Sequence, residues 1–312
     1  MKRILSMVMM IVITVTSFGF CSYNSNSVVS ADTVSWPSGP GLVAETAVMI
    51  DASTGSVLFD KKCHQKMYPA SITKIMTALL TIENCNLDDT VTFSQSAIDT
   101  LEPEAANIGA VVGEEMSVKD CLYALMLQSA NEVASALAEH VSGSIEEFAK
   151  LMNKRAKQAG ANDAHFANAC GLFNKKHYVT AYDMAKIMQA ALQYPVFREI
   201  INSSSYTLPT DNKRKEPLTI SQRHQMVQPW NSFHYDGIIG GKTGFVNESG
   251  TTLVTSAQRD GMTLITVVLN SPGTNSYVDT TALLDFGFKN FKLTNVSEND
   301  TRFENKSTFT NN

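Results

Sequence analysis

The hydrophobic residues in the first third of the chain recur with two different periods. Apolar stretches at 46–51 and 56–60 flank the turn-forming sequence Ala-Ser-Thr-Gly at 52–55, which predicts a β-hairpin. After Pro69, apolar side chains occur at positions 72, 75, 76, 79 and 80. Because this spacing places them on one helical face, a core-facing helix is predicted to start at about Ser71.

A long helical block is predicted from about residue 87 to residue 192, where apolar positions keep a helical period. Within it, Ser117 and Asp120 are spaced as a capping box in front of an apolar run, which predicts a helix start at that point. The block is therefore interpreted as a helical subdomain.

Strand character returns after this block. Ile238 and Ile239, residues 251–257 and residues 262–269 are apolar stretches, and a tight Arg-Asp-Gly turn joins the last two. We expect these segments to pair antiparallel, before helical spacing resumes at 276–291. The predicted fold class is α/β (α+β), with an antiparallel sheet flanked by helices and an inserted all-helical subdomain.

The first 31 residues have the layout of a secretory signal peptide. A basic start precedes an apolar run at 4–20, and small residues at 29–31 suit a signal peptidase, so cleavage is predicted after Ala31. The alternative is a retained membrane anchor, although a run of 17 residues is shorter than the ~20 that a spanning helix needs. Membrane contact is expected only in that case.

Two further segments flank the expected folded domain, residues 42–291. Residues 32–41 hold two prolines and two glycines and are predicted to be a linker. Residues 292–312 are rich in Asn, Ser and Thr and poor in aliphatic side chains, so they are predicted to be a disordered tail.

The composition after the signal narrows the function. The remaining 281 residues can bury a large core, and without Lys2 and Arg3 there are 23 basic against 30 acidic residues, which argues against a nucleic-acid partner. Four cysteines remain, with no C-x-x-C pair, so neither a zinc cluster nor a disulfide scaffold is indicated. No cofactor or metal is expected.

Ser71 and Lys74 form the only S-x-x-K sequence in the chain. At a helix start, Lys74 comes round to the face of Ser71 and can hydrogen-bond its hydroxyl. The lysine can act as a base if burial lowers its pKa enough to leave a neutral amine near neutral pH. Taken alone, the motif also fits a serine N-cap followed by a solvated lysine.

Two more polar groups follow along the chain. Ser-Ala-Asn at 129–131 interrupts an apolar period, which predicts a short loop between helices. Lys-Thr-Gly at 242–244 follows two glycines and precedes a strand pair, which places a cation and a hydroxyl on a strand edge. Each tripeptide alone is often incidental, but all three motifs in this order, at intervals of 58 and 113 residues, are a strong signal.

At these residues the chain resembles the penicillin-recognising serine enzymes, specifically the low-molecular-weight penicillin-binding proteins of the serine-type D-alanyl-D-alanine carboxypeptidase family. The resemblance extends to residues 50–55, 69–77, 168–172 and 180–184, and it covers about 42–291. It implies a β-lactamase/DD-peptidase-like fold in which residues 42–291 are the catalytic domain.

The family resemblance implies an exported, cell-wall-associated enzyme. It would remove the terminal D-alanine of peptidoglycan stem peptides that end in D-Ala-D-Ala, and β-lactams would be covalent inhibitors. Ser71 would form the acyl-enzyme, Lys74 would take its proton, and Ser129 would relay a proton to the departing amine.

The same resemblance implies the substrate-binding residues. Asn131 would orient the substrate amide, Lys242 would hold the local field positive, and Thr243 would bind the terminal carboxylate. Gly244 belongs to the same substrate-binding strand. The backbone N–H groups of Ser71 and Phe245 would form the oxyanion hole.

Some positions depart from the family pattern. Residues 271–278 contain no Arg or Lys, although many relatives use one there to help hold the substrate carboxylate. Carboxylate binding is therefore expected to rest on Lys242 and Thr243. Glu132 stands where an Asp commonly follows the Asn, and Val246 where a Thr commonly follows the aromatic residue.

Two other functions are compatible with these motifs. A β-lactamase would need a glutamate in the loop after the helical block to activate the deacylating water, and residues 160–176 contain none. A protein that binds penicillin or cell-wall peptides without turnover is the second alternative. None of the six histidines falls in an H-E-x-x-H sequence, and no G-x-S-x-G is present.

Overall fold

The structure is a computed structural model of the 312-residue chain, and it describes residues 36–295 and 307–311. The predicted signal peptide, residues 1–31, lies outside the described residues. Within the described part, none of the helices has the length and apolar character needed to cross a bilayer.

The predicted hairpin is formed by strands β1 (Thr46–Asp51) and β2 (Val57–Lys61), which pair antiparallel. Its turn is held by Asp51, whose Oδ1 accepts hydrogen bonds from the backbone N–H groups of Ser53 and Thr54 at 3.0 and 2.8 Å. An aspartate side chain that accepts hydrogen bonds from the backbone of the next few residues commonly stabilises a turn. The hairpin prediction is confirmed.

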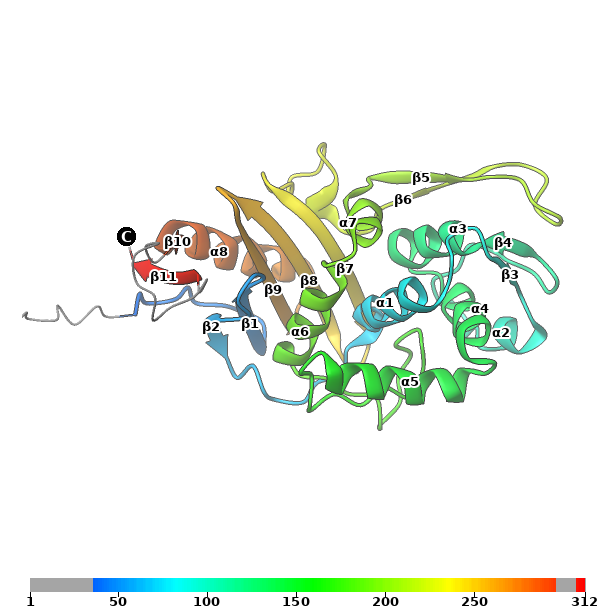
Figure 1. The fold of residues 1–312 in the computed structure, drawn as a ribbon, viewed down its shortest axis with the longest axis horizontal. Coiled ribbons are helices and arrows are strands. Elements are labelled where there is room, and N and C mark those ends of the chain that lie inside the picture. The colour runs from blue at the N-terminus through cyan, green and yellow to red at the C-terminus, as the bar shows by residue number, and fades with distance from the viewer. Residues whose placement is uncertain (1–35, 296–306, 312) are drawn as a thin grey trace, which may run out of the picture. The chain divides into compact units, whose positions relative to one another are not determined.

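Three further strands complete a five-stranded antiparallel sheet: β7 (Ile238–Val246), β8 (Gly250–Arg259) and β9 (Met262–Ser271). The strand order is β2-β1-β9-β8-β7, so β9 lies in the middle of the sheet, between the N-terminal hairpin and β8 (Figure 1). The predicted antiparallel pairing is confirmed, and β7 is left as an edge strand.

The two faces of this sheet are buried in two separate cores. Met49 and Leu264 pack on one face with helix α8 (Asn275–Asn290), whereas Ile50 and Ile265 pack on the other face with the helical part of the molecule. Neighbouring strand residues point to opposite faces, so β9 is buried at eight of its ten positions instead of alternating between buried and exposed. The predicted helix at 276–291 is α8.

Helix α1 (Lys74–Asn84) occupies the centre of the helical part (Figure 1). All residues from Lys74 to Thr81 are buried, because α1 packs against α4, α5 and α6 as well as the turn in front of it. The surrounding helices are α2 (Gln95–Asp99), α3 (Val118–Tyr123), α4 (Asn131–Ser142), α5 (Ile145–Gln158), α6 (Ala181–Ala191) and α7 (Pro195–Asn202).

The region predicted to be helical also contains a pair of short strands. Strands β3 (Thr90–Thr92) and β4 (Glu115–Ser117) pair antiparallel, and strands of three residues are too short to interrupt a helical period visibly. The predicted cap is present, since Ser117 Oγ accepts the N–H of Asp120 at 3.0 Å where α3 begins. A second hairpin follows α7, formed by β5 (Ser205–Leu208) and β6 (Leu218–Ser221).

Residues 36–41, part of the predicted linker, contact the folded domain. Trp36 Nε1 donates a 3.3 Å hydrogen bond to the carbonyl of Leu58, and its ring lies 5.2 Å from that of Phe291 between centroids. Among the described residues, contacts with the domain therefore extend back to Trp36, ahead of the start at Leu42 that the sequence predicts.

The C-terminal segment, predicted to be disordered, contains two strands. Strand β10 (Phe291–Asn295) pairs antiparallel with β11 (Ser307–Asn311). Phe291 is buried against Phe286, which anchors β10 to the end of α8, and the Thr-Phe-Thr sequence of β11 has high strand propensity. The prediction is wrong for these strands, and the residues between them lie outside the described part.

Candidate active site

Ser71 lies in a short 3₁₀ helix, Ala70–Thr73, that runs directly into α1. The predicted helix start is therefore confirmed, with a 3₁₀ turn in front of the α-helix. Ala70 has a positive φ of 51°, which is uncommon for a residue with a side chain. The carbonyl of Pro69 accepts a 2.8 Å hydrogen bond from Thr252 Oγ1 on β8, so the turn is attached to the sheet.

The side chain of Lys74 is completely buried and points at the hydroxyl of Ser71. Its Nζ lies 3.1 Å from Ser71 Oγ, and it also donates to Asn131 Oδ1 at 2.5 Å and to the carbonyl of Cys170 at 2.8 Å. Burial lowers the pKa of Lys74 to about 8. A usable fraction of neutral amine is thus present near neutral pH, as a general base requires.

The segment Asn168–Leu172 packs directly against the turn that carries Ser71. Gly171 has a φ of 91°, and a Cβ at this position would lie 1.9 Å from the carbonyl oxygen of Ala70. Only glycine fits this contact. Asn168 holds the segment in place, because its Oδ1 accepts the N–H of Gly171 at 2.7 Å.

Ser129 and Asn131 lie in the predicted connection between two helices. A π-helical turn, Ala124–Gln128, ends at Ser129, which adopts a left-handed backbone with φ of 65°, and Asn131 begins α4. Such turns are frequent at functional sites. Both side chains are buried, and the Oγ of Ser129 has no hydrogen-bond partner among the described residues. This hydroxyl can therefore bond a ligand.

Lys242 and Thr243 lie on the edge strand β7. Lys242 is fully buried, and its Nζ donates a 3.0 Å hydrogen bond to the carbonyl of Thr243. Burial lowers the pKa of Lys242 well below its usual value, and the nearby ammonium of Lys74 acts in the same direction. The region behind Ser71 thus contains two buried lysines close enough to influence each other.

Gly244 allows β7 to pass beside the nucleophile candidate. A Cβ on Gly244 would lie 2.8 Å from the backbone nitrogen of Ser71 and 2.5 Å from Thr252 Oγ1. The N–H of Ser71 therefore lies beside the strand that carries Phe245. This placement suits the two backbone donors that the resemblance implies for an oxyanion hole.

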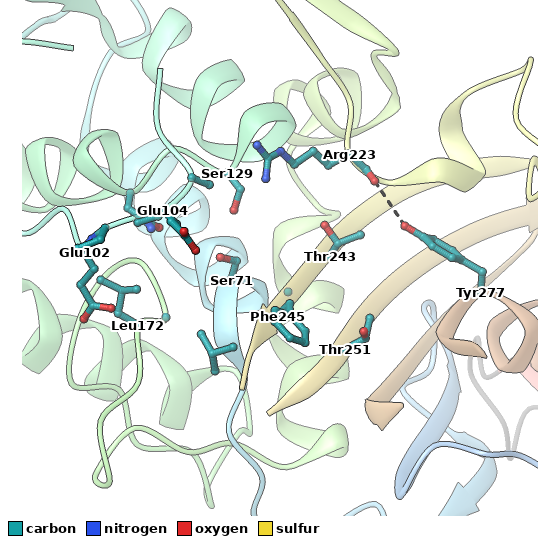
Figure 2. Close-up of a pocket in the computed structure, with 17 residues that line it drawn as sticks. Ser71, Glu102, Glu104, Ser129, Leu172, Arg223, Thr243, Phe245, Thr251 and Tyr277 are labelled. Atoms are coloured by element: carbon teal, nitrogen blue, oxygen red, sulfur yellow. Dashed lines mark hydrogen bonds between the residues drawn. The ribbon is translucent and has the colours of Figure 1, made fainter. Parts of the chain in front are cut away.

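A pocket of about 430 Å³ opens over these residues (Figure 2). Six of the eight predicted site residues line it, and the two lysines are buried behind it. The six are Ser71, Ser129, Asn131, Thr243, Gly244 and Phe245.

Arg223 lines the same pocket and was not predicted from the sequence. It lies between β6 and the next short 3₁₀ helix, with its N–H bonded to the carbonyl of Leu127 at 3.2 Å and its carbonyl accepting from the hydroxyl of Tyr277 at 3.4 Å. From the sequence, Lys242 is the only cation expected near the substrate carboxylate. The structure adds a guanidinium from a segment that carries no motif.

Glu102 and Glu104 line the opposite side of the pocket and were also missed. Figure 2 shows them on one side of Ser71, with Arg223 on the other. Both belong to the exposed stretch between α2 and β4, where isolated acidic residues give no sequence signal. The pocket therefore has one acidic and one basic side.

Glu132 is buried behind the pocket. One carboxylate oxygen accepts the N–H of Ile108 at 2.7 Å, and the other has no partner among the described residues. Burial raises the pKa of Glu132, and hydrogen bonds from backbone N–H groups together with the ammonium of Lys74 oppose that rise. The longer side chain at this family-variant position thus anchors a neighbouring loop.

Two buried histidines support the site without lining it. Ala167 donates its N–H to His177 Nδ1 at 3.3 Å, so the neutral ring carries its proton on Nε2 and donates to Thr73 Oγ1 at 2.9 Å. His224 Nε2 lies 2.8 Å from Thr255 Oγ1. Burial lowers the pKa of each ring to about 3, so both are neutral at physiological pH.

The cysteines of the described part are free. Burial raises the pKa of Cys170, which keeps its thiol protonated and unreactive. Cys85, Asp89 and His140 place one possible metal-ligand atom each within 4.8 Å of one another, although the sequence gives no reason to expect a metal. Asp89 already accepts the N–H of Asn86 at 2.8 Å, and these residues do not line the pocket.

The assembled groups suit acyl transfer. A hydroxyl bonded to a buried amine is an activated nucleophile, and backbone donors beside it can stabilise an oxyanion. The unpartnered hydroxyl of Ser129 can pass a proton to a leaving group. The guanidinium of Arg223 on the pocket wall can attract an anionic group of a ligand.

Comparison with solved structures places this fold in a known class. The chain superposes on the DD-transpeptidase of Streptomyces K15 with a TM-score of 0.74 and 29% identity, over 81% of this chain and 99% of that one. The fold is that of a DD-peptidase, and the predicted fold class is confirmed.

Residues 33–273 match the family described as D-alanyl-D-alanine carboxypeptidase, and the chain belongs to that family. It is 35% identical over 254 residues to D-alanyl-D-alanine carboxypeptidase DacF of Bacillus subtilis, a match that covers 80% of this chain but 63% of that relative. It is 33% identical over 264 residues to DacB2 of Mycobacterium tuberculosis, covering 83% of this chain and 86% of the relative. The family predicted from the sequence is confirmed.

Proposed function

We propose that this protein is an exported D-Ala-D-Ala carboxypeptidase that removes the terminal D-alanine of peptidoglycan stem peptides through an acyl-enzyme on Ser71. The observation that carries the proposal is the 3.1 Å contact between Lys74 Nζ and Ser71 Oγ at a pocket wall. Family membership supplies the reaction, and the relatives' names support the substrate.

The acylation step uses groups on both sides of the scissile bond. Neutral Lys74 accepts the hydroxyl proton as Ser71 Oγ bonds to the carbonyl carbon between the two D-alanines. The developing oxyanion is held by the N–H groups of Ser71 and Phe245. The C–N bond then breaks, and the departing D-alanine amine receives the proton held by Lys74 through the hydroxyl of Ser129.

Deacylation reverses these roles with water as the nucleophile. A water molecule attacks the Ser71 ester, and its proton passes to Lys74. Lys74 returns that proton to Ser71 Oγ as the C–O bond breaks, and the shortened peptide leaves as a carboxylate after losing its acid proton to solvent. Asn131 holds the substrate amide throughout. Its Oδ1 is occupied by Lys74, so its NH₂ group is the part free to donate.

The substrate's terminal carboxylate is bound at the basic side of the pocket. Thr243 offers a hydroxyl and Arg223 a guanidinium, and buried Lys242 strengthens the positive field from behind. A planar guanidinium can hold a carboxylate through two parallel hydrogen bonds. Arg223 thus supplies the cation that residues 271–278 lack.

Export and penicillin binding belong to the same proposal. The signal-like sequence of residues 1–31 supports secretion to the cell wall, where the stem peptides lie. A β-lactam presents a strained amide and a carboxylate to the same groups, so we propose that it acylates Ser71. Residues 160–176 contain no glutamate to activate a deacylating water, which supports a long-lived adduct over β-lactamase activity.

The test compares the purified protein with its Ser71→Ala variant. The wild type should release D-alanine from an acyl-D-Ala-D-Ala peptide and gain a persistent penicilloyl mass on Ser71, and the variant should do neither. Ser56→Ala, which alters an exposed hydroxyl, should behave as wild type. Binding of penicillin without D-alanine release would refute the proposed activity, and rapid penicillin turnover would indicate a β-lactamase.

A further inference from the structure

The acidic side of the pocket has no role in the reaction described above. Glu102 and Glu104 line the pocket from the exposed stretch after α2, and neither forms an ion pair with another residue in the described part of the chain. Their charges are therefore uncompensated within the described structure. They lie across Ser71 from Arg223 (Figure 2).

Hydrogen bonds hold this acidic stretch next to the pocket. Beyond it, the carbonyl of Ala106 accepts the N–H of Asn131 at 2.8 Å, and the N–H of Ile108 donates to the buried carboxylate of Glu132 at 2.7 Å. The chain that carries Glu102 and Glu104 is thus tied to the first residues of α4. It is held next to the groups that bind the substrate.

The backbone of the stretch has an uncommon conformation at one of the two glutamates. Glu104 has a φ of 65°, in the left-handed region that disfavours a residue with a long side chain by about 1 kcal/mol or more. Such conformations cluster at ligand-binding positions. Figure 2 shows that the Glu104 carboxylate extends toward Ser71.

A second observation also points to a ligand in this pocket. The hydroxyl of Ser129 is buried, lines the pocket and has no hydrogen-bond partner among the described residues. A buried hydroxyl without a hydrogen-bond partner costs free energy, and a ligand that bonds to it removes that cost. The pocket therefore holds a hydroxyl, in the same cavity as the two glutamates, that a bound ligand can satisfy.

We propose that Glu102 and Glu104 form a cation subsite that binds a protonated side-chain amine on the residue before D-Ala-D-Ala. The inference rests on the proposed function, which sets the direction of the substrate. With its carboxylate at Arg223 and Thr243 and its scissile carbonyl at Ser71, the preceding residue extends toward the two glutamates. The favoured substrates are stem peptides whose diamino residue carries a free, uncrosslinked amine.

The test uses two peptides that differ only in that amine. Nα-acetyl-L-Lys-D-Ala-D-Ala keeps the charge and Nα,Nε-diacetyl-L-Lys-D-Ala-D-Ala removes it. The ratio of the kcat/KM values for the two peptides is measured in the wild type and in each variant. A change in activity that affects both peptides equally cancels in this ratio. We expect the wild type to favour the free amine about 5- to 10-fold, the range for two partly exposed charges, and to lose this preference as salt is raised.

The variant Glu102→Gln/Glu104→Gln should bring the ratio to about 1. Glu115→Gln, which alters an exposed acid outside the pocket, is the matched control and should keep the wild-type ratio. Equal use of both peptides by the wild type, or a preference that survives in the double variant, would overturn the subsite. Failure to release D-alanine from either peptide would instead overturn the proposed function.

Discussion

The amine of Lys74 and the side-chain oxygen of Asn131 are joined by a 2.5 Å hydrogen bond, although the two residues are 57 positions apart. The bond links the first motif of the site to the second. It orients the lysine toward Ser71 and leaves the NH₂ group of the asparagine free to donate. One contact thus aligns the proposed base with a proposed substrate-binding group.

Acylation of Ser71 by penicillin should become faster as pH rises and level off above about 8. Burial lowers the pKa of Lys74 to about 8, and only its neutral form can accept the serine proton. Stopped-flow acylation rates across this range measure the inflection. A rate that does not change with pH would exclude Lys74 as the base.

Glu132→Gln should move that inflection to lower pH. The carboxylate of Glu132 raises the pKa of Lys74, and glutamine removes the charge while keeping an acceptor for the N–H of Ile108. Glu147→Gln, which alters an exposed acid, should leave the inflection in place. An inflection that stays fixed or moves to higher pH in Glu132→Gln would contradict the electrostatic coupling.

Arg223→Gln should lower kcat/KM for a D-Ala-D-Ala peptide by about 10- to 100-fold, the effect of losing a charged hydrogen bond. The loss should lie mainly in KM. Arg223→Lys should recover part of it, because a lysine keeps the charge but not the planar fork. Steady-state kinetics with the peptide and its C-terminal amide test this role, since an equal loss with both would show that Arg223 does not bind the carboxylate.

Gly171→Ala should lower the free energy of unfolding by about 3 kcal/mol or more. The new methyl group would meet the carbonyl of Ala70 at 1.9 Å, and the backbone has a positive φ as well. Gly143→Ala is the matched control, because its φ of 79° is similar but nothing lies within 4 Å, so it should cost only about 1 kcal/mol. Urea denaturation of both variants checks the difference, and equal losses would show that the contact with Ala70 is not tight.

Acid should destabilise the protein through His177 and His224. Burial lowers both pKa values from 6.5 to about 3, so the unfolded chain binds more protons between these limits. Their contribution to stability is complete above about 6.5 and is lost as pH falls toward 3, by up to about 1.4 kcal/mol per pH unit for each ring. Urea midpoints measured across this range should fall less steeply in His177→Asn/His224→Asn, whereas His64→Asn, an exposed position, should retain the wild-type slope.

Local patterns predicted the central elements of the fold. The spacing of Ser71 and Lys74, the turn at 52–55 and the apolar segments that became β8 and β9 all depend on residues close in sequence. Such signals can be read directly because strand and helix periods are short. The order of strands in the sheet depends on pairing between distant segments and was not predicted.

The two charged sides of the pocket could not be predicted for the same reason. Arg223, Glu102 and Glu104 are isolated in polar stretches, and only the tertiary fold brings them to Ser71. The strands of the C-terminal segment were missed because its composition resembles that of a disordered tail. Phe291, the buried residue that holds β10 against α8, lies just before this segment and so did not enter its composition.

The central position of β9 has a consequence for when the sheet can form during synthesis. Strand β1 has no partner on its inner side until residues 262–271 are available, so the sheet cannot close while most of the chain is still being made. Pairing across more than two hundred positions is slow compared with helix formation. A chain with this topology can complete its central sheet, and the pocket beside β7, only when nearly its whole length is available.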